Sequence, residues 1–113
     1  MTLKTKHKPL KIKILGETWK VYYLTCGEYV AQFDEHSDAI THYNHPTGYR
    51  VISFRLKRFT QVAVKHELMH AYFSYTDMRG CTYAQTEEAM CEKLSRYWRA
   101  LERNTRRIVK SKP

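Results

Sequence analysis

The first part of the chain alternates apolar and polar residues with a period of two. Residues 10–15, Leu-Lys-Ile-Lys-Ile-Leu, place lysines on one side and aliphatic residues on the other, which is typical of a strand with one buried face. Residues 19–24 resume the strand-like character after a turn at Gly16-Glu17. Together these segments predict a β-hairpin over residues 10–24.

A second pair of strand-like segments follows an ambiguous stretch. Residues 39–43 and 49–54 flank residues 44–48, Asn-His-Pro-Thr-Gly, in which Pro and Gly favour a turn. They predict a second hairpin, and we expect its later strand to offer an edge to which an extended peptide can add. Residues 25–35 fit either a short helix or a short strand, and the pattern leaves that choice open.

The second half of the chain changes to helical spacing. Residues 60–76 contain no Gly or Pro, and Thr60 is a suitable N-cap. Residues 83–106 predict a further helix, reached through a connector that contains Gly80. The apolar stripe expected on this last helix consists of Met90, Cys91, Leu94, Tyr97, Trp98 and Leu101. Strands followed by helices predict an α+β fold, with a small antiparallel N-terminal sheet of two hairpins and then two helices.

Composition places these elements in one globular domain over residues 1–113. The length suits a single core, and 42% hydrophobic residues with nine tyrosines are typical of a folded chain. We expect residues 1–9 to be a basic leader and residues 104–113 a flexible basic tail. The chain contains no run of 18 apolar residues, so we expect no transmembrane helix. The three cysteines, Cys26, Cys81 and Cys91, form no CxxC pair, which favours a reducing, cytoplasmic location.

The charge of the chain is strongly basic and uneven. The formal net charge is +9, from 20 Lys and Arg against 11 Asp and Glu. Both ends are rich in Lys and Arg, a pattern that suits nucleic acid or an acidic protein partner. Because no nucleic-acid motif accompanies these charges, a solvated basic surface explains them more simply. We expect no membrane partner.

The residues His66-Glu67-Leu68-Met69-His70 carry the most specific chemistry in the chain. They form an HExxH motif inside the first predicted helix. Histidines four residues apart lie on one helix face, about 6 Å apart along the axis, where both can bind one zinc ion. Glu67 lies about 100° around the helix from His66, where it can act as a general base without binding the metal. The motif therefore predicts a zinc site with Glu67 as the catalytic base.

Catalytic zinc usually has three protein ligands, and the sequence offers several candidates for the third. A metzincin would carry Gly at position 73 and His at position 76, but the chain has Phe73 and Thr76, which excludes that class. Asp77 follows His70 too closely for easy geometry, and Cys81 has no supporting spacing.

Glu87 and Glu88, near the start of the last predicted helix, are the better candidates for the third ligand. Glu87 shares a face with apolar residues of the expected stripe. Glu88 lies four residues before Glu92, which can accept a hydrogen bond from a ligating histidine. We favour Glu88 and keep Glu87 open.

The combination of HExxH with a glutamate on the following helix resembles the gluzincin metallopeptidases. Residues 66–71 and 87–94 are similar to small zincin domains of the ImmA/IrrE-like kind found in phages and mobile elements, and the resemblance covers residues 48–101. It implies that His66, His70 and Glu88 bind Zn²⁺ and that Glu67 is the general base. We expect no helix-turn-helix domain of the kind that such regulators often carry within these 113 residues, so the resemblance leaves the substrate open.

The expected activity is hydrolysis of peptide bonds in a protein or peptide substrate. His42 and His45, in the second hairpin, are candidates to help stabilise the oxyanion. The alternative is a non-catalytic binding module with a zincin fold, which contacts nucleic acid or an acidic protein through its basic ends.

Overall fold

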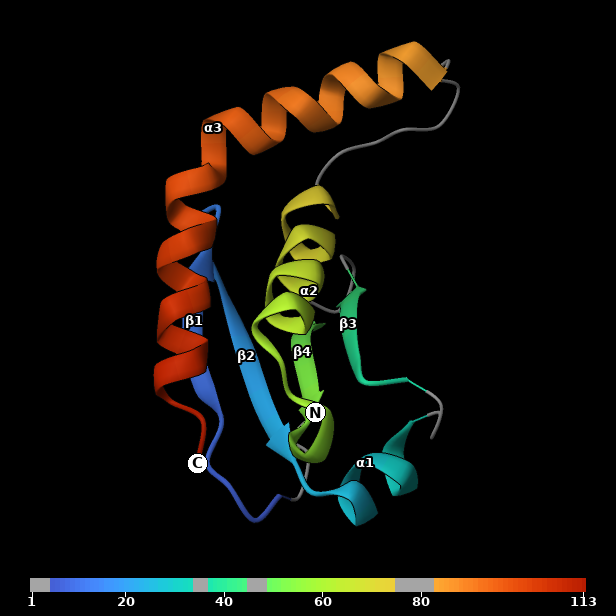
Figure 1. Cartoon of the computed structure of the whole chain (residues 1–113), viewed down its shortest axis with the longest axis vertical. Helices are drawn as coiled ribbons and strands as arrows, with labels where there is room; N and C mark the ends of the chain where they lie inside the picture. The colour runs from blue at the N-terminus through green and yellow to red at the C-terminus, as the bar shows by residue number, and fades with distance from the viewer. Residues whose placement is uncertain (1–4, 34–36, 45–48, 75–82) are drawn as a thin grey trace.

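Within the residues that the structure describes, the chain forms four strands and three α-helices (Figure 1). The computed structural model describes residues 5–33, 37–44, 49–74 and 83–113. The strands are β1 (Leu10–Ile14), β2 (Glu17–Leu24), β3 (Ala39–Asn44) and β4 (Tyr49–Arg55). The helices are α1 (Cys26–Gln32), α2 (Gln61–Phe73) and α3 (Tyr83–Lys110), with one 3-10 turn at Leu56–Arg58. The α+β class and both hairpins are therefore confirmed.

The sheet is mixed, so the prediction of an antiparallel sheet was wrong. Its strand order is β1-β2-β4-β3, in which β1/β2 and β3/β4 are antiparallel and β2/β4 is parallel. After β2 the chain passes through α1 and returns in β3, two strand positions from β2. β4 then fills the gap and runs in the direction of β2. The expected peptide-accepting edge at β4 was also wrong, because β4 is an inner strand and β3 forms the edge.

Helix α1 resolves the stretch that the sequence left ambiguous. Thr25 caps the helix by accepting from the main-chain N–H of Glu28 at 3.3 Å, and the Glu28 carboxylate accepts from the Thr25 N–H at 2.9 Å. This reciprocal capping box satisfies two main-chain donors at the start of the helix. It favours helix over strand at the point where β2 ends.

The turn between β1 and β2 lies one residue earlier than expected. Leu15 and Gly16 both have positive φ, at 51° and 80°. Two consecutive positive φ angles are typical of a type I′ turn, whose twist matches that of a hairpin. The alternation of β1 is retained, since Ile12 and Ile14 are buried while Lys11 and Lys13 are exposed.

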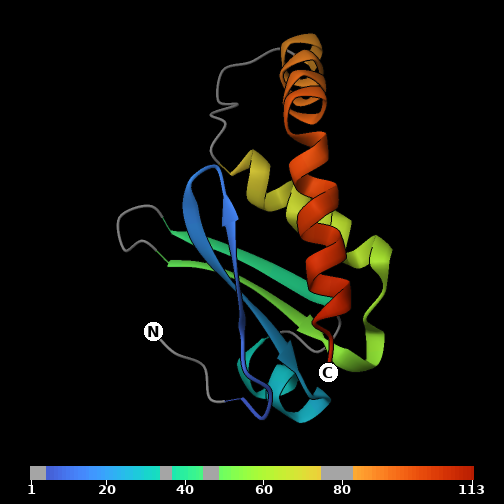
Figure 2. The same ribbon diagram turned by 90° about the vertical axis from the view of Figure 1, so that its left-hand side faces the viewer.

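The two faces of the sheet are covered by different helices (Figures 1 and 2). On one face α2 and α3 pack against a core that includes Trp19, Val21, Ile52 and Phe54. A smaller cluster on the other face packs near α1 and contains Tyr22, Leu24, Tyr29 and Val51. The larger core joins residues of β1, β2, β4, α2 and α3, so both predicted helices stabilise the same sheet.

Helix α3 continues to Lys110, whereas we expected residues 104–113 to be a flexible tail. Asn104, Thr105 and Ile108 are buried. The Asn104 amide donates to the main-chain oxygen of Lys13 at 3.0 Å. The Tyr23 hydroxyl donates to the main-chain oxygen of Ile108 at 2.7 Å. These contacts hold the C-terminal half of α3 against the sheet.

The N-terminal half of α3 uses little of the expected apolar stripe. Leu101 is buried, but Cys91 is exposed and Trp98 is 42% exposed. The helix changes direction about half-way along and its first half projects beyond α2 (Figure 1). Ser95 donates to the carbonyl oxygens of Cys91 and Glu92, a local bond that often bends helices. No helix in the described ranges is long and apolar enough to span a membrane.

Candidate metal centre

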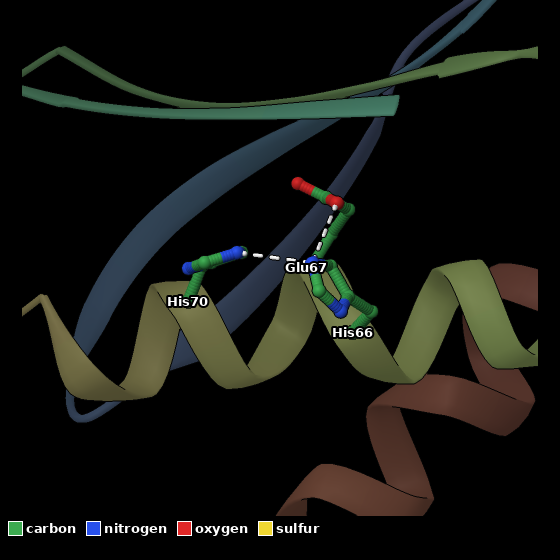
Figure 3. A group of neighbouring side chains, drawn as sticks. All are labelled: His66, Glu67 and His70. Atoms are coloured by element: carbon green, nitrogen blue, oxygen red, sulfur yellow. Dashed lines mark hydrogen bonds and ion pairs between the residues drawn. The ribbon is translucent and has the colours of Figure 1, made fainter. Parts of the chain in front are cut away.

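Helix α2 places three residues of the HExxH motif around one point in front of β3 (Figure 3). Thr60 caps the helix as expected, because its hydroxyl accepts from the N–H of Ala63 at 3.0 Å. The side of α2 that packs on the sheet is formed by Val64, Leu68, Ala71 and Tyr72, all of which are buried. With about 100° per residue, His66 and His70 lie on the far side of the helix and Glu67 lies between them and the core.

The two histidines approach each other through their Nε2 atoms. The Nε2 atoms are 3.1 Å apart, and the rings cross at 78° with centroids 4.7 Å apart. Two nitrogen ligands on a tetrahedral zinc, each about 2.0–2.1 Å from the ion, would lie about 3.3–3.4 Å apart. The separation of the two imidazole nitrogens therefore fits a shared metal ion closely.

Glu67 is buried and held by a residue of the sheet. The residue is 7% exposed, whereas both histidines are exposed. Its Oε1 accepts from the Thr41 hydroxyl at 2.7 Å, and its Oε2 lies 3.9 Å from His66 Nε2. The ligand atoms of His66, Glu67 and His70 all lie within 4.8 Å of one another. The carboxylate therefore has one oxygen fixed by β3 and the other directed to the histidines.

A cleft opens above these three residues, between α2 and β3. It has a volume of about 520 Å³. Its lining comprises Ala39, Ile40, Thr41, Tyr43, His66, Glu67, His70 and Ser74. A neighbouring hollow of about 350 Å³ shares Ala39, His66 and Glu67 and extends toward the start of α2. The histidines thus lie along a groove that follows the edge strand.

The structure does not bring the expected third ligand to the histidines. Glu88 and Glu87 are both exposed on the first half of α3, and Glu92 pairs instead with Arg96 at 2.8 Å. Among the described residues, the group that can hold a metal ion consists of His66, Glu67 and His70 alone. Binding of zinc by Glu88 therefore stays a prediction. The weaker candidates Asp77 and Cys81 lie outside the described residues.

His42, one of the two histidines expected to assist the oxyanion, does not line the cleft. His42 lies on β3, but its side chain packs against Phe33 and Tyr49, with ring centroids 5.3 Å and 6.1 Å away. These contacts are on the face of the sheet opposite α2. His45 lies outside the described residues.

Sequence reasoning missed two residues of the cleft, Thr41 and Tyr43. Both lie on β3 on the same face as Ala39, so the alternation of that strand already groups them. What the sequence did not reveal was that β3, rather than β4, is the edge strand beside α2. The phenol of Tyr43 stacks on Trp19 and takes a cation–π contact from Arg50 at 5.9 Å, which fixes its ring at the cleft wall.

Comparison of the chain with protein-family models, curated proteins and solved structures found no match. The resemblance to small gluzincins therefore stays an expectation from the sequence motif.

Proposed function

We propose that the chain is a small zinc metallopeptidase with a zincin-like fold. The observation that carries the proposal is the pair of Nε2 atoms 3.1 Å apart, beside a buried glutamate at the floor of a cleft. If α2 were simply an amphipathic helix with two solvated histidines, Glu67 would be expected to stay in water, because burial of a carboxylate is costly without a partner. Glu67 instead accepts a hydrogen bond from Thr41 and faces His66, an arrangement that suits a carboxylate with a chemical role.

His66 and His70 would hold the metal ion, with Glu88 as the predicted third ligand. Zinc supplies Lewis acidity, which makes a nearby water molecule more acidic and polarises a carbonyl group. Glu67 takes the proton of the attacking water at Oε2, because Oε1 is already engaged by Thr41. The same carboxylic acid then delivers the proton to the amine that leaves.

The edge strand β3 is the natural binding place for an extended peptide. Among the described residues no strand pairs with its outer edge, so its main-chain groups are available to a further strand. A peptide added there would pass over His66 and Glu67. Tyr43 lines the same cleft, and among the described residues it is the tyrosine of that lining whose phenol could donate to a substrate carbonyl oxygen.

The test begins with the metal content of protein purified without a histidine tag. We expect about one zinc per chain and hydrolysis of a peptide library that stops on addition of a chelator. Glu67→Gln should keep the zinc and abolish hydrolysis. Glu102→Gln, which removes a carboxylate of α3 that lines neither hollow, is the control and should keep both. Protein without bound metal, or hydrolysis that survives Glu67→Gln, would contradict the proposal.

A further inference from the structure

A straight row of cations runs along the outward face of α3. Arg99, Arg103, Arg106 and Lys110 are separated by four, three and four residues, and all four are exposed. At about 100° per residue they fall within a sector of about 60°. The buried side of the same helix, with Leu101, Asn104 and Ile108, lies opposite. We call these four residues the cationic row.

The row is poorly neutralised. Arg106 lies 4.0 Å from Glu102. Arg99, Arg103 and Lys110 form no ion pair with any acidic side chain in the described part of the chain. Residues 93–112 contain eight Lys and Arg and the single acid Glu102. A net positive charge is therefore concentrated on one side of this helix.

This arrangement costs folding free energy. Like charges three or four residues apart destabilise a helix by roughly 0.2–0.5 kcal/mol per pair. The helix dipole favours cations in the last turn, which accounts for Lys110. Arg99 and Arg103 lie more than one turn before the end of α3, where that effect is lost. Because the fold does not offset this repulsion between like charges, we expect an anionic ligand to offset it.

We propose that the cationic row binds the phosphate backbone of duplex DNA. The positions are rigid because the opposite side of α3 is held to the sheet through Asn104 and Ile108. Three of the four are arginines, whose planar guanidinium suits bidentate phosphate contacts. The binding would be independent of base sequence, since nothing in the row reads base edges.

The side chains around the row favour a duplex over other polyanions. A protein interface usually needs a buried apolar or aromatic anchor, and a single strand usually stacks on aromatic rings. Trp98, the exposed aromatic of this half of α3, lies about 80–140° around the helix from the members of the row. Its ring is also contacted by Lys65 of α2 at 5.8 Å. The cationic row therefore offers positive charge without an aromatic or apolar anchor, which suits the phosphate backbone of a duplex.

The experiment measures binding of a fluorescent mixed-sequence DNA duplex by anisotropy as salt is varied. Four phosphate contacts predict a log–log slope of about −3.6, which is a loss of roughly 100-fold in affinity between about 50 and 200 mM salt. R99Q/R103Q/R106Q should make the slope shallower by about 2.7. The charge-conserving R99K/R103K/R106K should keep the wild-type slope, provided that its circular dichroism is unchanged.

The matched control is K11Q/K13Q/K20Q, which removes the same charge from the opposite face of the sheet. These lysines alternate with buried residues of the main core, so they point away from α3. The control should leave the slope nearly unchanged. An equal effect of both triple variants would overturn the proposal, because net charge alone would then explain binding. Row-dependent binding of poly-glutamate without binding of DNA would overturn it in favour of an acidic protein.

Discussion

The hydroxyl of Thr41 on β3 donates to the carboxylate of Glu67 on α2 across 2.7 Å. The same hydroxyl oxygen lies 3.1 Å from the main-chain carbonyl oxygen of Glu67. One residue of the edge strand therefore contacts both the side chain and the backbone of the proposed base. This contact fixes the distance between β3 and α2 as well as the orientation of the carboxylate.

Loss of the Thr41 hydroxyl should impair the chemical step more than substrate binding. Hydrogen bonds to charged groups contribute about 1.5–3 kcal/mol, so we expect Thr41→Val to lower kcat by about 10-fold or more. KM and zinc content should change little, and Thr41→Ser should restore most of the rate. Steady-state kinetics with zinc analysis measure these effects. A variant that keeps the wild-type kcat would show that Thr41 only packs.

The prediction of Glu88 as a ligand can be tested against its neighbour. Removal of an outer-shell partner typically weakens metal binding by about 10–100-fold, and loss of a ligand should cost at least as much. We therefore expect Glu88→Gln to weaken zinc binding by more than 10-fold, measured by competition with a chelator. Glu87→Gln, also exposed on α3, should bind zinc as the wild type does. Equal affinities in both variants would exclude Glu88.

The sequence predicted the local elements well and their arrangement less well. Alternation defined β1, β3 and β4, and Thr60 marked the start of α2, because these signals lie within a few residues of one another. The parallel pairing of β2 with β4 depends on contacts between residues about 30 apart, which no local pattern encodes. The capping box at Thr25 was present in the sequence and would have identified α1.

The site was predictable to the extent that one helix contains it. His66, Glu67 and His70 meet because of helical spacing alone. Thr41 joins the same site because β3 is the edge strand beside α2. Its role therefore depends on the strand order, which the sequence did not reveal. The last helix was misjudged in a different way. Its buried residues continue through Asn104 and Ile108, where the density of Arg and Lys had suggested a tail.

The packing of the end of α3 on the sheet can be tested by comparing a buried residue with its exposed neighbour. Ile108 is fully buried, whereas its neighbour Val109 is 38% exposed. We expect Ile108→Ala to lower the free energy of unfolding by about 2–5 kcal/mol. Val109→Ala should change it by no more than about 0.5 kcal/mol. Urea denaturation followed by circular dichroism compares them, and equal values would mean that residues 104–110 do not pack on the sheet.

Stability should also fall at alkaline pH through Tyr23. Burial raises the pKa of Tyr23 from 10.0 to about 12, partly opposed by Arg107. Below pH 10 the phenol is neutral in both states and its stabilisation is complete. Between pH 10.0 and about 12 the phenol of Tyr23 is ionised in the unfolded chain but still protonated in the folded one, so the free energy of unfolding decreases as pH rises.

Tyr23→Phe isolates this contribution. The variant leaves the carbonyl oxygen of Ile108 without its 2.7 Å donor and should be less stable at neutral pH by about 1–3 kcal/mol. Its further loss of stability between pH 10.0 and 12 should be smaller than that of the wild type. Denaturation curves at several pH values measure both effects. Parallel pH profiles in the two proteins would contradict the assignment.

The open edge of β3 can pair with a second copy of the chain. At the opposite end of the sheet, Asn104 of α3 donates to the main-chain carbonyl oxygen of Lys13 on β1. The outer edge of β3 has no partner strand within the described residues. An unpaired edge strand is a template for a further strand, so two copies can pair edge to edge through β3. In such a pair each copy would cover the other's cleft, and concentrated protein would reversibly inhibit itself.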